Sequence, residues 1–278
     1  MKPVLVSETD PVVHDLRKRL DTFYRTTNEY YAFQSRSWHP QLWSYVVDAI
    51  AHFQKGSCRI LEVGSGRSGF AEYLRQREVT GHLTAHDVTS SNEAYLKENA
   101  DKVVIGDLHQ LTETFDIIFS TFVLEHTTDP VATLDTCWRL LNPGGKLFIF
   151  CPRYDAPFYL PRSADHYSGF ARAGIALQLM AARFHSLVTQ KPRFFIHPDP
   201  AVFTLPWKRD RDAVHWVSYF DLAIFFSRKG HSLKLHVQSG GLKDAIVKNF
   251  LQVSMVVEKP AGASPSGSGS ISRPRRPD

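Results

Sequence analysis

The stretch "RILEVGSGRSGFAEYL", residues 59–74, decides the fold of this chain. It begins as a short apolar run, passes through three glycines and continues with the spacing of a helix. The glycines let the chain turn sharply and bring bare backbone close to a ligand. Glu62 is the unusual residue, because an acid inside an apolar strand needs a partner. The ligand of this turn must therefore be one that tolerates a carboxylate.

Around this stretch, from residue 59 to 152, short β-rich apolar runs alternate with helical patterns. This alternation predicts an α/β fold with a doubly wound, mostly parallel sheet. A helix is expected over residues 129–141, with Asp129 as N-cap and Pro130 in the first turn, and "NPGG" ends it. The expected seven strands are residues 59–63, 82–88, 102–107, 115–122, 146–152, 232–238 and 251–259, with a helix over 219–230 before the last two.

The patterns divide the chain into five parts. An N-terminal helical arm, rich in aromatic residues, precedes the core, and an insertion with an apolar helix follows the fifth strand. The tail is too poor in apolar residues to fold, so we expect it to be disordered. The expected parts are the arm or lid 1–56, the core 57–152, the insertion 153–211, the C-terminal part of the core sheet 212–259, and the tail 260–278.

Composition predicts an ordinary globular protein. The chain has 278 residues, of which 43% are hydrophobic and 22% charged. Three widely separated cysteines indicate neither a disulfide framework nor a zinc cluster, so a cytoplasmic location is expected. The net charge of +5 is mixed with acids along the chain, which argues against nucleic acid as a partner. No apolar run is long enough for a transmembrane segment.

Gly64, Gly66 and Gly69 match the G-x-G-x-x-G pattern of dinucleotide-binding turns, and Asp87 ends the next strand about 20 residues later. A pyrophosphate would be repelled by Glu62, whereas a ligand that carries an ammonium group would be attracted. S-adenosylmethionine has an ammonium, a sulfonium and a ribose, so the two acids suit it. Glu62 could also hold the glycine-loop amides, and both roles are compatible.

Five ordered motifs carry a family resemblance: "ILEVGSGRSG", Asp87, "GDLHQL", "FDIIFSTFVLEHTTDP" and "RLLNPGGKLFIFCP". In order and spacing they resemble the class I S-adenosylmethionine-dependent methyltransferases, in particular the "type 11" small-molecule group that includes quinone-biosynthesis enzymes. The resemblance implies a Rossmann-like methyltransferase fold and S-adenosyl-L-methionine as cofactor. It covers residues 59–152 closely and the last helix and strands more loosely. One departure is Ser68, where the family often has glycine.

The resemblance also implies roles for individual residues. The glycine loop would approach the methionine and ribose, and Asp87 would bind the ribose hydroxyls. Asp107, with the amide of Leu108, would meet the adenine edge, although Asp107 could instead only form a turn. Ser120 and Thr121 would line the cleft, or are simply polar strand ends. The expected cofactor-binding residues are Glu62, Gly64, Ser65, Gly66, Asp87, Val88, Asp107, Leu108, Ser120 and Thr121, with no metal ligand.

Two histidines are candidates for removing a proton from an acceptor, because each follows a strand whose carboxyl end faces the ligand edge. His126 belongs to the "LEH" motif that recurs in the family, and it could instead cap or pack beside the loop. His166 lies in the insertion, where a solvated loop is the alternative. Asp210, Asp212 and His215 lack tight ligand spacing, so a surface charge run is expected rather than a metal cluster.

The sequence therefore predicts an enzyme that methylates a small-molecule or carrier-linked acceptor, most readily at oxygen. The arm, with Tyr30, Tyr31, Phe33 and Trp38, and the insertion would form the acceptor pocket, and ordinary packing is the alternative for the arm. An NAD(P)-dependent oxidoreductase and a non-catalytic binding module are the competing hypotheses. The apolar helix near residues 173–182 is expected in the core or in a dimer contact; a pocket wall or peripheral membrane contact is the alternative. A monomer or a homodimer is expected.

Overall fold

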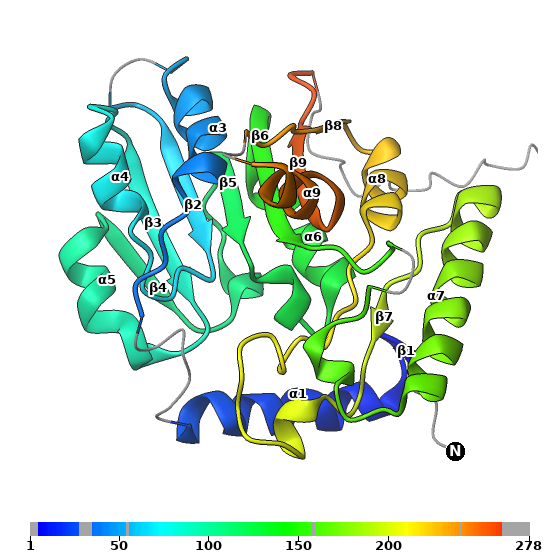
Figure 1. Ribbon diagram of the computed structural model, residues 1–278. Coiled ribbons are helices and arrows are strands. Elements are labelled where there is room, and N and C mark those ends of the chain that lie inside the picture. Colours follow the sequence, from blue (N-terminus) through cyan, green and yellow to red (C-terminus); the bar gives the residue numbers. More distant parts are fainter. Residues whose placement is uncertain (1–4, 28–34, 54–55, 157–158, 239–240, 263–278) are drawn as a thin grey trace, which may run out of the picture.

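The computed structural model describes residues 5–27, 35–53, 56–156, 159–238 and 241–262. A seven-stranded sheet with the order β4-β3-β2-β5-β6-β9-β8 lies at the centre (Figure 1). Its strands are β2 (Arg59–Val63), β3 (His82–Asp87), β4 (Lys102–Ile105), β5 (Phe115–Thr121), β6 (Leu141–Pro152), β8 (His231–Lys234) and β9 (Gln252–Glu258). The helices around it are α3 (Pro40–Ile50), α4 (Phe70–Gln76), α5 (Glu93–Asn99), α6 (Pro130–Leu140), α8 (Tyr219–Ser227) and α9 (Leu242–Phe250).

The first five strands of the sheet pair in parallel, which confirms the predicted doubly wound architecture. β9 runs antiparallel to both β6 and β8, so the sheet is mostly parallel, as expected. The strand order reverses between β2 and β5, the two strands that lie side by side at the centre. In open α/β sheets a ligand binds at such a reversal, outside the carboxyl ends of the strands.

Two apolar layers cover the sheet. Along β5, Ile117 and Phe119 pack with α3 and α4, whereas Ile118 between them packs with α6 and α8. This alternation follows from the pleat of a strand, which sends successive side chains to opposite faces. Both faces of the central strands are therefore buried, as a parallel sheet requires.

The arm and the insertion meet on the carboxyl-end side of the sheet. The arm contributes β1 (Val6–Ser7) and α1 (Pro11–Thr26), and the insertion contributes α7 (Gly169–Thr189) and β7 (Phe195–Ile196). β1 pairs with β7 in a two-stranded sheet. Arg17 of α1 donates to the Thr128 hydroxyl, 3.0 Å away, in the loop after β5. Figure 1 shows α1 crossing beneath the central sheet, and the arrow of β2 points toward this helix.

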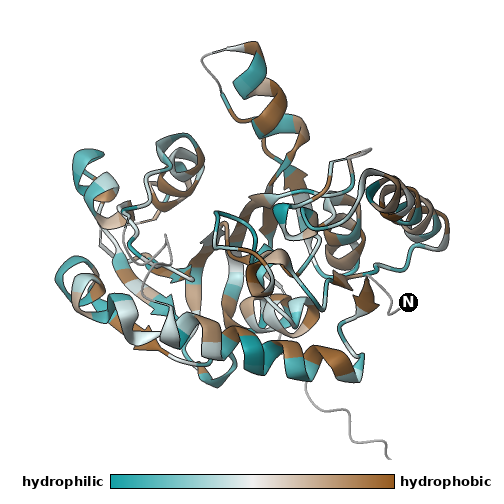
Figure 2. Cartoon of the chain, turned by 60° about the horizontal axis from the view of Figure 1, so that its bottom comes forward, coloured by the Kyte–Doolittle hydropathy of each residue, from teal (hydrophilic) through white to brown (hydrophobic). Residues whose placement is uncertain are grey.

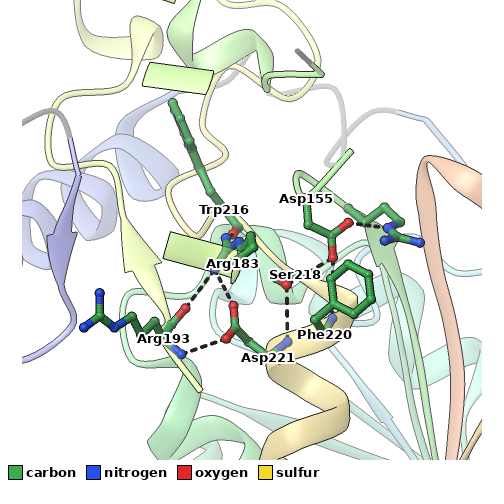
Figure 3. A network of polar contacts seen from close by, with 8 residues as sticks. Asp155, Arg183, Arg193, Trp216, Ser218, Phe220 and Asp221 are labelled. Atoms are coloured by element: carbon green, nitrogen blue, oxygen red, sulfur yellow. Dashed lines mark hydrogen bonds and ion pairs between the residues drawn. The ribbon is translucent and has the colours of Figure 1, made fainter. Parts of the chain in front are cut away.

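A buried polar network fastens the insertion to the core (Figure 3). Arg183 of α7 forms an ion pair with Asp221 of α8 and donates to the Trp216 carbonyl, 2.8 Å away. Asp221 also accepts from the Arg193 backbone amide at 2.9 Å. This ion pair holds α7 against α8, because burying the Arg183 or Asp221 charge without its partner would lower the stability of the fold.

Several local expectations differ from the structure. Asp129 stands at the N-cap of α6, but its side chain does not cap; it pairs with Arg17 at 2.7 Å. α9 and the β1–β7 sheet were not predicted from the sequence. Tyr30, Tyr31 and Phe33 of the arm, and residues 263–278 of the tail, lie outside the described residues. Within the described ranges, no helix has the length and apolarity to cross a membrane.

Candidate active site

The glycine loop between β2 and α4 is a tight turn that needs its glycines. Gly64 and Gly66 have φ values of 68° and 55°, in the left-handed region that disfavours side chains. A Cβ at Gly64 would lie 2.6 Å from the Val123 side chain, so only glycine fits there. The Ser65 amide donates to the His86 carbonyl at 2.8 Å, which joins the loop to β3. The loop is thus held against the carboxyl end of the neighbouring strand.

Glu62 is the second-last residue of β2, just before this loop, and is only 4% exposed. Burial raises the pKa of its carboxyl to about 8; hydrogen bonds from the Ser68 and Ser65 hydroxyls oppose this shift, and nearby Asp87 adds to it. The carboxyl is therefore mostly protonated at neutral pH in the ligand-free protein. A bound cation would favour its ionised form.

Ser68, the departure from the family pattern, has a defined task in this chain. Its side chain is 5% exposed, and its hydroxyl both bonds Glu62 and accepts from the Phe70 amide at 3.1 Å. The Ser68 carbonyl accepts from the Tyr95 hydroxyl at 2.8 Å. A glycine would leave Glu62 with one hydroxyl fewer. In this chain the Ser68 side chain therefore links Glu62 to the start of α4.

Asp87 ends β3 and faces the glycine loop. Its Oδ2 accepts from the Gly66 amide at 2.8 Å and its Oδ1 from the Thr89 amide at 3.1 Å. Burial raises its pKa, while the backbone hydrogen bonds of Thr89 and Gly66 lower it. Glu62 and Asp87 thus lie on either side of the same loop. The structure brings the two acids of the sequence analysis together.

Three further predicted cofactor residues follow β3 and β4. Val88 is 54% exposed beside Asp87, and Leu108 is buried in the core under the sheet. Asp107 accepts from the His109 amide at 2.9 Å, so it does form the turn that was its alternative role. These residues lie at the carboxyl edge of the sheet, which is the edge that a ligand of this fold contacts.

Ser120 and Thr121 end β5 next to the loop. Ser120 lines a small cavity together with Val63 and Val123, and the Thr121 hydroxyl lies 3.4 Å from the Trp43 indole nitrogen of α3. Trp43 itself is fully buried. Thr121 therefore contacts the arm, whereas Ser120 borders the small cavity on the α6 side of β5.

The described part of the arm after residue 34 lies on the glycine loop. The Ser37 amide donates to the Arg67 carbonyl, and the Gly69 amide donates to the Ser37 carbonyl, both at 3.0 Å. Trp38 packs against Trp43, with ring centroids 5.7 Å apart. A Cβ at Gly69 would come within 2.6 Å of the Trp38 ring, so Gly69 is required by the arm rather than by a ligand. The lid role of Trp38 stays a prediction.

His126 lies after β5 in a cluster of acids. Its Nδ1 is 3.1 Å from Oδ2 of Asp212, and its Nε2 is 3.9 Å from Oε1 of Glu125. Although burial lowers the pKa of His126, Asp212 and Glu125 outweigh burial and raise it to about 10. His126 is therefore an imidazolium at neutral pH. This finding argues against the neutral proton acceptor that the sequence analysis expected of it.

His166 lies elsewhere, in the insertion. Its ring is 4.0 Å from Tyr167 and 5.9 Å from His197 between centroids, and the Tyr167 hydroxyl bonds His197 at 3.2 Å. The His166 Nδ1 is buried without a hydrogen-bond partner among the described residues. No contact on the described part of the chain joins His166 to His126, so the two candidates belong to different clusters.

The expected surface charge run at residues 210–215 is wrong. Asp212 is 1% exposed and His215 is 0% exposed. The His215 ring bonds the Leu124 carbonyl at 2.9 Å, and burial lowers its pKa to about 3. Asp212 accepts from the Tyr24 hydroxyl of α1 at 2.9 Å. This segment is an internal support for the loop after β5, and no metal-binding group of three ligands occurs among the described residues.

Glu125 was not among the predicted site residues, yet it lies beside His126. It is 0% exposed, and neither carboxylate oxygen has a hydrogen-bond partner within the described ranges. Burial raises its pKa to about 7, opposed by the neighbouring His126. The sequence feature that could have indicated Glu125 is the "LEH" motif, in which this acid stands directly before His126 and after a strand.

Comparison with known proteins agrees with this geometry. Residues 61–149 match the family model described as a methyltransferase domain. A ubiquinone biosynthesis O-methyltransferase of Xanthomonas oryzae is 29% identical over 143 residues, which cover 44% of this chain and 60% of that protein. The one from Parvibaculum lavamentivorans is 51% identical over 100 residues, covering 33% of this chain and 39% of its own length. The chain thus spans at most about 60% of these two relatives.

Solved structures show more distant likeness. The 1,6-didemethyltoxoflavin N1-methyltransferase of Burkholderia thailandensis has 12% identity and a TM-score of 0.49, covering 94% of this chain and 93% of its own. The magnesium protoporphyrin IX methyltransferase of Synechocystis has 10% identity and a TM-score of 0.49, covering 87% and 99%. Residues 61–149 thus match a methyltransferase domain, and they lie on the mostly parallel seven-stranded sheet.

Proposed function

We propose that this chain transfers a methyl group from S-adenosylmethionine to a hydroxyl of a small-molecule or carrier-linked acceptor. The observation that carries the proposal is the pair of buried acids, Glu62 and Asp87, on either side of the glycine loop at the strand-order reversal. A dinucleotide would place a pyrophosphate over Glu62, and this anion would keep the acid protonated, whereas a cation would pair with its ionised form. The family's cofactor has an ammonium instead.

The residues present fit that cofactor. Glu62 is a buried acid held by Ser65 and Ser68, with its pKa raised to about 8 by burial. An ammonium beside it would lower that pKa, so we expect Glu62 to release its proton when the ligand binds near neutral pH. Asp87 accepts two backbone amides and still offers a charged acceptor to ribose hydroxyls.

S-adenosylmethionine supplies the electrophilic methyl group when bound. The chain has to align an acceptor with it, keep water out and take a proton from a hydroxyl. The arm residues Trp38, which is 39% exposed, and Trp43, which is fully buried, pack together beside the loop and suit water exclusion. For the proton we propose His166, because its Nδ1 lacks a partner among the described residues, and we assign His126 the role of shaping the cleft.

The acceptor class follows from the relatives, not from the site alone. The two curated relatives are named for O-methylation in ubiquinone biosynthesis. Another relative is named a ubiquinone/menaquinone biosynthesis C-methyltransferase, 26% identical over 147 residues. We therefore propose a phenolic or quinone-precursor hydroxyl as the acceptor, with sugar and natural-product hydroxyls as the other acceptors to assay.

Calorimetric titration tests the cofactor. The wild-type chain should bind S-adenosylhomocysteine and S-adenosylmethionine, and NAD should give no heat above dilution. The Glu98→Gln variant, an exposed acid on α5, should bind as the wild type does. Binding of NAD without binding of the methyl donor would end the proposal. Binding of the donor without transfer to any phenolic, sugar or quinone-precursor hydroxyl would leave the non-catalytic module as the better hypothesis.

A further inference from the structure

α7 has two apolar faces. The inner face, with Ile175 and Leu179, is buried in a cluster that includes Trp216. The outer face is uncovered by any described residue, and Figures 1 and 2 show α7 at the edge of the molecule. Its large side chains are exposed as follows: Phe170 95%, Leu177 57%, Met180 40%, Phe184 70%, Leu187 40% and Val188 65%.

This outer face carries no free charge. The two arginines of α7 are engaged elsewhere: Arg172 contacts Asp165 at 3.3 Å, and Arg183 forms the buried pair with Asp221. No acid occurs in the helix sequence. An uninterrupted apolar face of this kind on a 21-residue helix is typical of a surface that another body covers.

The spacing on the outer face is that of a helix-packing seam. Phe170, Leu177 and Phe184 recur every seven residues, and Met180 and Leu187 follow three residues after two of them. A repeat of 3.5 residues is the pattern by which one helix meets another. A lipid surface requires no such register, since it has no complementary holes.

Large and small side chains alternate so that the face complements itself. In an antiparallel pair related by a two-fold axis, with residue 170 of one copy opposite residue 187 of the other, Phe184 falls on the second copy's Ala173 and Gly174. A Cβ built at Gly174 would meet nothing within 4 Å, so there is room for a ring. Leu177 then lies against Met180 of the other copy.

We propose that α7 is the contact surface for a second copy of this chain, in an antiparallel helix pair. A fully exposed side chain of this size has roughly 150–200 Å² of surface, so the six exposed residues offer about 600 Å² per copy. A symmetric pair would bury about 1,200 Å², the lower limit of standard stable interfaces. The dimer should therefore be concentration-dependent. A membrane contact is less well supported, because both arginines within α7 are held in ion pairs with acids.

Sedimentation velocity and light scattering on the full chain test the proposal. The wild type should shift from monomer to dimer between about 1 and 100 μM, and Phe184→Glu should raise the dissociation constant about tenfold or more. The matched control is Leu242→Glu on α9, at a side chain that is 78% exposed, which should leave the dimer unchanged. Circular dichroism checks that both variants fold. A wild-type monomer at all concentrations, or equal effects of the two variants, would overturn the proposal.

Cross-linking tests the geometry independently. In the antiparallel pair, two copies of residue 177 lie about 4.5 Å apart along the helix axis, and two copies of residue 170 about 26 Å apart. A short bismaleimide should therefore link Leu177→Cys but not Phe170→Cys, since the native cysteines are buried. Linkage at Phe170→Cys alone would refute the antiparallel arrangement. Flotation of a monomer with vesicles of phosphatidylethanolamine and phosphatidylglycerol, lost in Phe184→Glu, would assign the face to lipid instead.

Discussion

Replacing Glu62 by Gln should stabilise the ligand-free protein, by an amount that grows with pH. Burial raises the pKa of Glu62 from 4.5 to about 8. Because the folded value lies above the unfolded one, the carboxyl costs no stability below pH 4.5, and its cost rises with pH until it is complete above about pH 8. Each pH unit in that range is worth about 1.4 kcal/mol, so the cost reaches at most about 5 kcal/mol. Gln has the shape of the protonated acid and avoids this cost.

Thermal unfolding of the wild type and Glu62→Gln without ligand, at pH 5.5 and 8.5, measures the effect. At about 2–4 °C per kcal/mol for a chain of this size, the gain in Tm should be about 3–6 °C at pH 5.5 and at most about 10–20 °C at pH 8.5. Glu98→Gln, at an exposed position, should show no such trend. An equal gain at both pH values would refute the reasoning. Calorimetry in two buffers of different ionisation enthalpy should also show proton release on donor binding in the wild type and none in Glu62→Gln.

Three further changes test other parts of the site. Asp87→Ala should weaken S-adenosylhomocysteine binding by about 1–3 kcal/mol in calorimetry, because a charged acceptor that also holds the Gly66 amide is lost; unchanged affinity in a folded variant would contradict its role. Arg183→Met should lower the free energy of unfolding by about 3–5 kcal/mol in urea denaturation, because it leaves the buried Asp221 charge unpaired; a loss below about 1 kcal/mol would show that the pair is not needed. His166→Ala should reduce turnover on a hydroxyl acceptor by roughly 10²- to 10⁴-fold with donor affinity retained, and a loss of only a few-fold would remove it as the base.

The sheet was predictable because its signals are local. Each apolar run from β2 to β6 is bounded by turn residues, and strand and helix patterns alternate between them. β6 begins at Leu141, five residues before the predicted strand, because "LNPGG" joins the strand through a register shift opposite β5. α9 was missed since its sequence, LKDAIVKNF, is short and its apolar residues are exposed rather than periodic around a core.

That the proposed cofactor residues meet could also be predicted, since they lie at strand ends in one continuous segment. Glu62, the glycine loop and Asp87 are brought together by the pairing of β2 with β3. The role of Ser68 was not, because its hydroxyl acts on Glu62 across the loop, a contact that spacing alone does not predict. The resemblance to a family with glycine at that position pointed away from it.

The cluster around His126 was not predicted, because its residues are far apart in the sequence. His126 follows β5 in the core, Asp212 follows the insertion, and Tyr24 belongs to α1 of the arm, yet His126 and Tyr24 both contact the Asp212 carboxylate. Taken alone, His126 suggests a neutral base, whereas the acids beside it raise its pKa to about 10. The stability that this charge contributes is therefore full below pH 6.5 and is lost as pH rises from 6.5 through the folded pKa of about 10. An NMR titration should find the His126 ring still protonated at pH 8. In Asp212→Asn the ring should titrate at lower pH, because this variant removes the acid that raises the His126 pKa most. A wild-type ring that titrates near pH 6.5 would mean that arm, core and insertion do not meet at this residue.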